Sequence, residues 1–302
     1  MPLAERSPRR SRTASCASIP VLLLLLALGF SIRCNTSRLD VQMEAARSKS
    51  REIPSVTIVT AANDLYAEAL ENLVASAKFW APEHPVVVYN LGGLDVDKVR
   101  SWSNVAAVEW EDGIPSDYPP HVHHPKKYAW KPIILNETVH RYHSVLWLDA
   151  GSTLRGPIDP VEQVLREEGV FLVKGQDNNM ELAHPSSFQY LGVPLDRTQP
   201  HYAGNTQGYT LNHYVDSIVI PNAKCALIAA CIAPEGSSLS NHRYDQTTLS
   251  ILAYQAHAPH QTGYLAVSRD QLEHDIRRPS SRFIWTSRGE SREYIDHQRG
   301  SR

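Results

Sequence analysis

The sequence predicts an α/β domain in which helices cover both faces of a mixed, mostly parallel sheet. Apolar runs of strand length alternate with stretches of helical periodicity through residues 56–110. These runs are rich in β-branched residues and stop at small or polar ones, as buried strands do. A further apolar run, 144–149, ends on Asp149. Such alternation is typical of a parallel sheet that binds ligands at the carboxyl ends of its strands.

The elements are expected in regular order at first and in less regular order later. The expected strands are 56–60, 85–91, 105–110, 144–149, 169–174 and 215–220. The expected helices are 66–80, 95–102, 132–142, 159–168, 223–231 and 246–255. Residues 111–127, with many Pro and His, predict a loop. Residues from 287 onward are rich in Arg and Glu and predict a solvated tail.

The N-terminus carries a targeting pattern. Four arginines precede an apolar run from Ala17 to Ile32, which is the order of a secretory signal or a signal anchor. The run is a little shorter than the roughly 20 apolar residues of a spanning helix, and Ala27 and Gly29 offer a small-x-small cleavage site. Anchor and cleaved signal therefore both stay open. The arginines predict that the segment before the run is cytosolic.

Five parts are expected along the chain: a basic cytosolic N-terminus at 1–16, a signal anchor or signal peptide at 17–32, a polar stem at 33–53, the folded domain at 54–286 and a charged tail at 287–302. Either interpretation of the apolar run places the folded domain in the secretory lumen. We expect a single-pass type II protein of the Golgi or ER membrane, with secretion as the alternative.

Two other patterns suit a lumenal protein. Asn35 and Asn136 each begin an N-glycosylation sequon. Cys225 and Cys231, six residues apart, predict either a disulfide in an oxidising compartment or two small buried side chains on one helix. The formal net charge is -2, and the basic residues form no cluster outside the extreme N-terminus. A nucleic-acid partner is therefore not expected.

Asp149 is the sharpest candidate site residue. A carboxylate at the end of a central strand lies where α/β sheets bind ligands. Such a group can bridge Mg²⁺ or Mn²⁺ to a diphosphate, because hard cations prefer oxygen ligands. The alternative is that Asp149 only caps the following turn, as aspartate often does.

Three motifs in order resemble those of GT-A fold glycosyltransferases, which have a mixed, mostly parallel sheet. They are Trp130-Lys131-Pro132, the segment VLWLDAG at 145–151, and NHRYDQTTL at 241–249. The nearest likeness is to an uncharacterised nucleotide-diphospho-sugar transferase-like group that reads Trp-Lys-Pro, Leu-Trp-x-Asp and His-Arg-x-Asp-Gln. The resemblance spans about residues 54–285. It implies a GT-A-like fold and a nucleotide-sugar donor.

The resemblance also assigns roles to single residues. Asp149 would contact the metal and diphosphate, and Asp245 with Gln246 would face the acceptor side of the donor sugar. A carboxylate there can act as a general base or stabilise an oxocarbenium-like centre; Asp245 can also cap the helix that follows. The remaining donor-site candidates are Asn63 and Asp64 near the nucleoside, Gly204 and Gln207 in the small-residue loop 203–208, and Gly151 and Lys131 beside Asp149.

One position departs from the family pattern. The second acid of Asp-x-Asp is Gly151 here, which weakens a site for Mn²⁺ or Mg²⁺. Two sources of compensation are open. His121, His123 and His124 could bind the metal, because imidazole is a suitable ligand. The alternative is that these three histidines only make the loop polar, which is the more common case. Lysine pairs with phosphate as a point charge, and Lys131 is preferred over Lys126 and Lys127.

The leading functional hypothesis is transfer of a sugar from a nucleotide donor to a glycan, protein or lipid acceptor in the secretory pathway. The alternative is a catalytically inactive GT-A-like protein that binds carbohydrate or nucleotide, or acts as a scaffold, which Gly151 favours. A secreted hydrolase is disfavoured, because the sequence has neither Gly-x-Ser-x-Gly nor His-Glu-x-x-His.

Overall fold

The computed structural model describes residues 55–174, 179–260, 266–268, 283–286 and 292–300. The basic N-terminus, the apolar run, the stem and Asn35 lie outside these residues. Within the described ranges, no helix combines the length and the apolar character that crossing a membrane requires.

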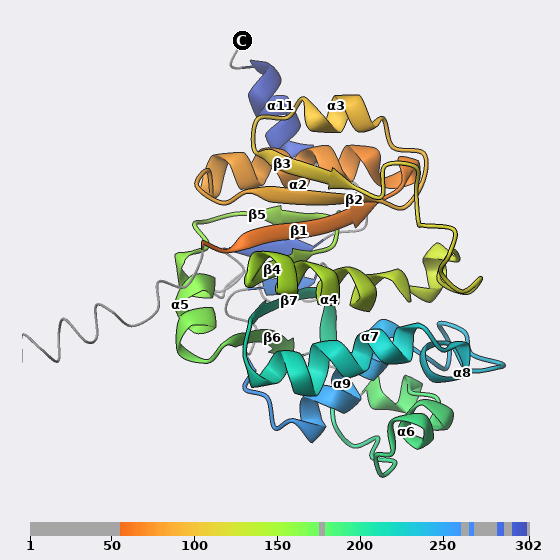
Figure 1. Ribbon diagram of the computed structural model, residues 1–302. Helices are drawn as coiled ribbons and strands as arrows, with labels where there is room; N and C mark the ends of the chain where they lie inside the picture. The colour runs from red at the N-terminus through yellow and green to blue at the C-terminus, as the bar shows by residue number, and fades with distance from the viewer. Residues whose placement is uncertain (1–54, 175–178, 261–265, 269–282, 287–291, 301–302) are drawn as a thin grey trace, which may run out of the picture. The chain divides into compact units, whose positions relative to one another are not determined.

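A six-stranded sheet forms the centre of the domain (Figure 1). Its order is β3-β2-β1-β4-β7-β6, and its strands are β1 (Thr57–Ala62), β2 (Val86–Asn90), β3 (Val105–Glu109), β4 (Ser144–Leu148), β6 (Val170–Lys174) and β7 (Tyr202–Thr210). β1 to β4 pair in parallel, whereas β7 runs antiparallel to β4 and to β6. The predicted mixed, mostly parallel sheet is confirmed.

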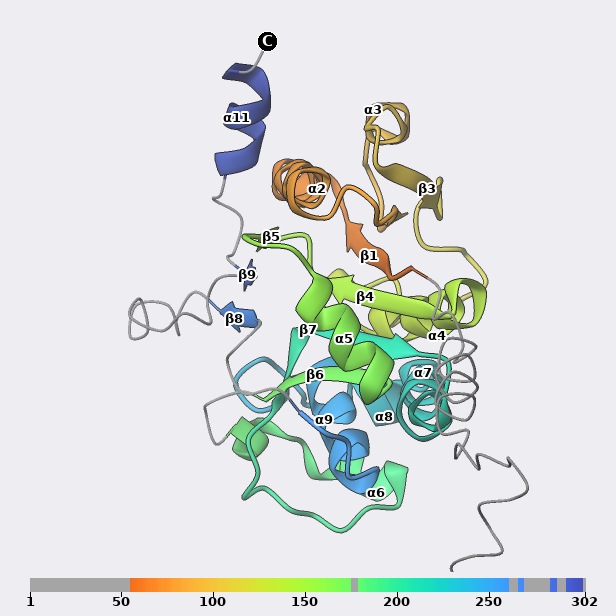
Figure 2. The ribbon, with the colours of Figure 1, turned by 90° about the vertical axis from the view of Figure 1, so that its left-hand side faces the viewer.

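Helices cover both faces of this sheet. The α-helices are α2 (Ala67–Trp80), α3 (Val96–Arg100), α4 (Trp130–Tyr142), α5 (Asp159–Glu167), α6 (Pro185–Leu191), α7 (Ile220–Ala226), α8 (Ala229–Ile232), α9 (Asp245–Gln255) and α11 (Glu293–Gly300). Shorter helical turns are η1 (Asp64–Tyr66), η2 (Pro125–Lys127), η3 (Asn179–Leu182) and the π-helix η4 (Val215–Val219). Figures 1 and 2 show α7 between α4 and α9, with which it is in contact.

The pleat of β4 explains the two cores. Val145 and Trp147 point into a core that includes α4, α7 and α9. Leu146 and Leu148 point into a second core that includes α2 and α5. Successive side chains of a strand face opposite sides of the sheet, so the unbroken apolar run of β4 is a strand buried on both faces.

Several segments differ from the sequence prediction; for example, the helix expected at 223–231 is divided into α7 and α8. Residues 215–220, expected as a strand, form η4 and the start of α7, because Val215, Ile218 and Val219 pack into the core with α4 and α9. Tertiary packing overrides strand propensity here. Residues 203–208, expected as a loop, belong to β7. Small residues suit that strand: a Cβ at Gly208 would lie 3.2 Å from Leu165, Phe171 and the carbonyl of Val145.

A second, three-stranded sheet begins with the strand that follows β4 in the chain. β5 (Ser152–Leu154) pairs with β9 (Ile284–Thr286), which pairs with β8 (Ala266–Ser268). Further along, residues 292–300 were expected in a solvated tail, yet they include α11, which packs on α2. Tyr294 is buried, its N–H donates to Asn72 Oδ1 at 3.0 Å, and its hydroxyl accepts from the Trp80 indole at 2.6 Å. The charged composition hides this apolar anchor.

A disulfide joins Cys225 at the end of α7 to Cys231 in α8. Of the two alternatives left open by the spacing, the structure has the disulfide, and both cysteines are also buried. Two carbonyls of the closed loop accept hydrogen bonds from distant segments. His121 Nε2 donates to Ala226 O at 2.8 Å, and Ser187 Oγ donates to Cys231 O at 2.7 Å. The disulfide therefore stabilises a junction of three segments.

Removing this disulfide with Cys225→Ala and Cys231→Ala is expected to lower the free energy of unfolding by about 2 to 3 kcal/mol, because a short closed loop no longer restricts the unfolded chain. Denaturant unfolding with and without dithiothreitol measures the effect. The reductant should move the wild-type curve towards the variant and leave the variant unchanged. Identical curves for oxidised wild type and variant would contradict the prediction.

Candidate functional site

The site centres on the ammonium of Lys131, which lies among three oxygens. Nζ is 2.8 Å from Asp149 Oδ1 and 3.2 Å from Asp245 Oδ2, and it donates to Gly204 O at 3.0 Å. The lysine comes from the first turn of α4, Asp149 directly follows β4, Asp245 begins α9, and Gly204 is in β7. The structure thus brings four of the predicted site residues together.

Local backbone geometry places the two ends of this cluster. The N–H of Asp149 donates to Asn205 O at 2.9 Å, which extends the pairing of β4 with β7 beyond Leu148. Tyr244, directly before Asp245, has φ 47° and ψ -119°, a conformation that costs a residue with a side chain about 1 to 3 kcal/mol. Its hydroxyl donates to Ser237 O at 3.3 Å. Strain next to a buried carboxylate is typical of functional sites.

Two of the three charged groups of the cluster are buried. Lys131 is 3% exposed and Asp245 is 8% exposed. Burial alone would lower the pKa of Lys131, but the carboxylates of Asp149 and Asp245 outweigh it and raise the pKa, so the ammonium stays charged. The rings of Tyr128, Trp130 and Trp147 lie 5.4 to 5.8 Å from Nζ, within the range of cation–π attraction.

Asp149 is the member of the cluster that faces solvent. About a third of its side chain, 35%, is exposed. Its Oδ1 accepts the indole N–H of Trp147 at 2.8 Å as well as contacting Lys131. The turn that follows is closed by the backbone carbonyl of Asp149, which accepts from the N–H of Ser152 at 2.8 Å. The carboxylate therefore has a task other than capping that turn.

Gly204 and Gln207 have internal roles. A Cβ at Gly204 would lie 3.2 Å from Asp245 Oδ2 and 3.4 Å from Gln246 Cβ, so the glycine lets β7 approach the start of α9. Gln207 is buried, accepts from the Tyr209 hydroxyl at 2.8 Å and donates to Gly204 O at 3.4 Å. Gly204 therefore contacts Lys131 directly, and Gln207 contacts Gly204. Gln246, next to Asp245, is partly exposed.

Asn63 and Asp64 lie at the carboxyl end of β1, beside the end of its parallel neighbour β4. Asp64 is exposed, and its N–H donates to Gly92 O at 3.2 Å. Two residues after Asp64, Tyr66 adds an aromatic ring that the sequence pattern does not single out. Tyr66 is half exposed and close enough to Tyr128 to contribute to its raised pKa, which burial chiefly causes. Tyr66 has no sequence signal of its own, because it falls within the apolar periodicity of the following helix.

Solved structures resemble this arrangement in fold. The WbbM bifunctional glycosyltransferase in its apo form matches with a TM-score of 0.52 and 11% identity, covering 79% of this chain and 46% of WbbM, so the chain spans about half of that protein. The galactosyltransferase LgtC, in complex with donor and acceptor sugar analogues, matches at 0.50 and 15%, covering 80% and 91%. An active-site mutant of LgtC matches at 0.53 and 13%, covering 82% and 96%. The chain has a GT-A-like fold.

No protein-family model and no curated sequence matches the chain. At 11 to 15% identity, the solved structures show the fold alone. The predicted fold class, a GT-A-like mixed, mostly parallel sheet with helices on both faces, is confirmed. The fold alone does not determine the function of this GT-A-like domain, because one fold supports many activities.

The described residues of this GT-A-like site do not fit a divalent cation. Asp149 Oδ1 and Asp245 Oδ2 both contact the ammonium of Lys131, which occupies the point where a metal would need them. Gly151 contributes no side chain. Across the described ranges, no group of three or more His, Cys, Asp or Glu residues is arranged to hold a metal. His121 and His123 instead bind backbone carbonyls, and in η2 Lys126 is exposed whereas Lys127 is partly buried.

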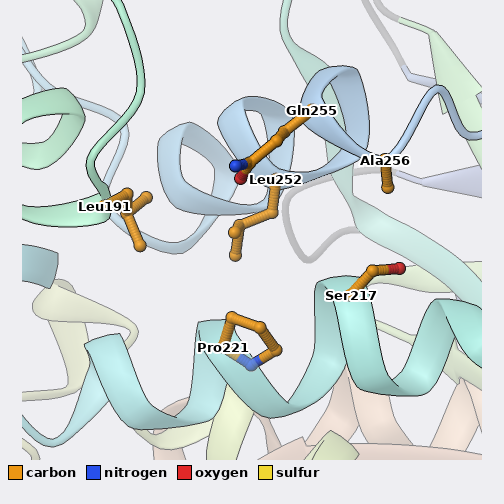
Figure 3. Close-up of a pocket in the computed structure, with 6 residues that line it drawn as sticks. All are labelled: Leu191, Ser217, Pro221, Leu252, Gln255 and Ala256. Carbon is orange, nitrogen blue, oxygen red and sulfur yellow. The ribbon is translucent and has the colours of Figure 1, made fainter.

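A pocket of the GT-A-like domain lies apart from the cluster, between α9 and the segments of α6, η4 and α7 (Figure 3). Its lining contains no ionisable side chain and none of the predicted site residues: Leu191, Ser217, Pro221, Leu252, Gln255 and Ala256. Nothing in this lining suits phosphate or a metal, so the charged cluster remains the candidate site.

The second sequon lies inside α4, whose first turn supplies Lys131. The Oδ1 of Asn136 is buried without a hydrogen bond, and the hydroxyl of Thr138 donates to Ile134 O at 2.8 Å. Glycosylation of Asn136 stays a prediction from the sequence.

Because of Asp245, the free energy of unfolding is expected to fall as the pH rises from about 4 to about 6. Burial raises the pKa of Asp245 from 3.8 to about 6, with Lys131 opposing the rise and Asp149 adding to it. A folded-state pKa above the unfolded one gives stability that is complete below the lower value and lost as pH rises through the higher. Asp245→Asn should remove this component, about 3 kcal/mol at most. Urea unfolding across this range measures it, and parallel pH curves for the two proteins would contradict it.

Proposed function

We propose that this protein binds a nucleotide sugar at the carboxyl ends of β1 and β4 and transfers the sugar to a glycan, protein or lipid acceptor. The observation that carries the proposal is the cluster of Lys131, Asp149 and Asp245. A buried ion triplet with one solvent-facing carboxylate, at the ligand-binding edge of an α/β sheet, is an arrangement that stability alone does not call for.

The exposed groups at this edge suit the parts of a nucleotide sugar. Asn63, Asp64 and Tyr66 follow β1 and would contact the nucleoside, with the half-exposed ring of Tyr66 available for stacking. Asp149 would face the sugar or the diphosphate beside Gly151. Asp245 and Gln246 would lie on the acceptor side, where a carboxylate with a pKa of about 6 is suited to general-base catalysis near neutral pH.

We also propose a lumenal location. The buried disulfide between Cys225 and Cys231 is of the kind that persists in oxidising compartments. The basic and apolar N-terminal sequence supports targeting to the ER or Golgi, as a single-pass type II membrane protein or as a secreted one. Localisation of the full chain, with protease protection of the domain in intact microsomes, tests both points.

The second candidate function is a GT-A-like binding protein without turnover. Gly151 and the pairing of both carboxylates with Lys131 favour it. Such a protein would bind a nucleotide sugar or a glycan and would release no nucleotide. Measuring donor hydrolysis and transfer together with binding separates this function from the leading one.

The binding test uses the full chain and a panel of UDP-glucose, UDP-galactose, UDP-N-acetylglucosamine and GDP-mannose. A donor that binds only the folded state raises the melting temperature, by an amount that grows with concentration. We expect at least one to do so and Asp149→Asn to weaken its binding by about tenfold or more, a loss typical of one charge-assisted hydrogen bond.

Asp97→Asn is the matched control, because Asp97 is almost fully exposed on α3 and outside the cluster. Its donor affinity should equal that of the wild type. If no sugar nucleotide binds, or if Asp149→Asn binds as tightly as Asp97→Asn, the proposed site is wrong.

A further inference from the structure

The contacts of Lys131 bear on how an anionic donor is held, an inference that rests on the proposed function. A cation bound by protein oxygens needs acceptors that converge on one point. Asp149 Oδ1, Asp245 Oδ2 and Gly204 O converge in this way, at 2.8 to 3.2 Å. The point where they meet is already filled by Nζ of Lys131, a cation that belongs to the chain.

A divalent ion on the same oxygens would stand within a few ångströms of the ammonium. Two positive charges at that spacing repel strongly, because Lys131 and Asp245 are buried. Lys131 cannot move aside easily, because its side chain is 3% exposed and three aromatic rings surround it. No second acid compensates at Gly151.

The same contacts leave the two carboxylates with a different use. With Lys131 balancing one of the two negative charges, Asp149 and Asp245 need not bind a metal to coexist. Ionised carboxylates accept hydrogen bonds, and sugar hydroxyls donate them. The partly exposed carboxylate of Asp149 is positioned for such a hydroxyl.

We infer that this site binds its sugar nucleotide without a divalent cation, with Lys131 as the positioning residue that holds Asp149 as an acceptor for a hydroxyl of the donor sugar and Asp245 on the acceptor side. Lys131 does not contact the donor itself in this arrangement. Its removal should turn the site into one that takes a metal, since two carboxylates would then converge with nothing between them.

The first experiment titrates MnCl₂ alone into the metal-free full chain by calorimetry. The wild type and Asp149→Asn should give the same heat, because neither binds Mn²⁺ at this site. Lys131→Met should gain Mn²⁺ binding and melt at a higher temperature with Mn²⁺, whereas Lys131→Met combined with Asp149→Asn should not. Mn²⁺ binding by the wild type that Asp149→Asn abolishes would overturn the inference, as would no gain in a folded Lys131→Met.

The second experiment measures the affinity of the wild type for the sugar nucleotides of the panel in EDTA and in Mn²⁺. The two dissociation constants should agree within about twofold, a free-energy difference too small for a lost metal contact. Binding seen only with Mn²⁺ would overturn the inference while supporting the proposed function. If no member of the panel binds in either buffer, the proposed function fails, and the MnCl₂ titration of the wild type still decides the inference, even where Lys131→Met does not fold.

Discussion

Replacing Lys131 with methionine is expected to lower the free energy of unfolding by about 3 to 5 kcal/mol, the loss typical of removing one partner from a buried ion pair. Methionine keeps most of the length of the side chain and its contacts with the aromatic rings. It removes the charge that separates Asp149 from Asp245. Asp245, already with a raised pKa because of burial, would lose the cation that opposes this rise.

This loss should exceed that of a surface ion pair, because the ammonium of Lys131 is buried. Exposed pairs contribute about 0 to 1 kcal/mol. Lys98→Met is the matched control, because Lys98 pairs with Glu71 at 2.8 Å and about half of its side chain is exposed. Urea unfolding near neutral pH compares the two variants. A loss for Lys131→Met no larger than that for Lys98→Met would show that the cluster is not a structural unit.

A double variant identifies the cause of the loss. If the uncompensated carboxylate is responsible, adding Asp245→Asn to Lys131→Met should restore part of the stability, because the asparagine is neutral. If methionine simply packs badly, the second substitution should restore nothing. The single variant Asp245→Asn provides the remaining corner of the cycle.

The sequence predicts the members of this cluster but not the way they meet. Asp149 stands out because an acid ends an apolar strand, and Asp245 because it lies in the segment 241–249 that resembles the Asp-Gln motif of the GT-A family. Both are local signals. That a single lysine on a third element contacts both is a property of the tertiary structure, and so is the burial that raises the pKa of Asp245. No spacing along the chain encodes either fact.

The same limit explains the misassigned elements. Neighbouring atoms lie close to β7 and leave room only for small residues, as at Gly208. Small residues carry little strand signal. Residues 215–220 have a strong strand signal but pack among helices. By contrast, the strands β1, β2 and β4 are buried on both faces, so that their apolar runs predict them directly.

Asp245→Asn is expected to reduce the rate of sugar transfer by about 10²- to 10⁴-fold, the usual contribution of a positioned acid or base, while the affinity for the donor changes little. The substitution keeps the shape of the side chain and removes its charge, so a loss of turnover without a loss of binding would come from chemistry and not from folding. A single-turnover assay with a donor that binds, at pH 7, measures the rate.

The pH profile of the wild type provides an independent reading of the same carboxylate. A base with a pKa of about 6 is ionised at pH 7 and protonated at pH 5, so the rate should fall as the pH drops through 6. In Asp245→Asn the residual rate should lack this limb. Gln246→Ala is the neighbouring comparison: it should lower the rate and keep the limb, because the amide does not titrate. Full turnover in Asp245→Asn, or a limb that persists in it, would move the catalytic role away from Asp245 and leave the carboxylate as an acceptor that only orients the sugar.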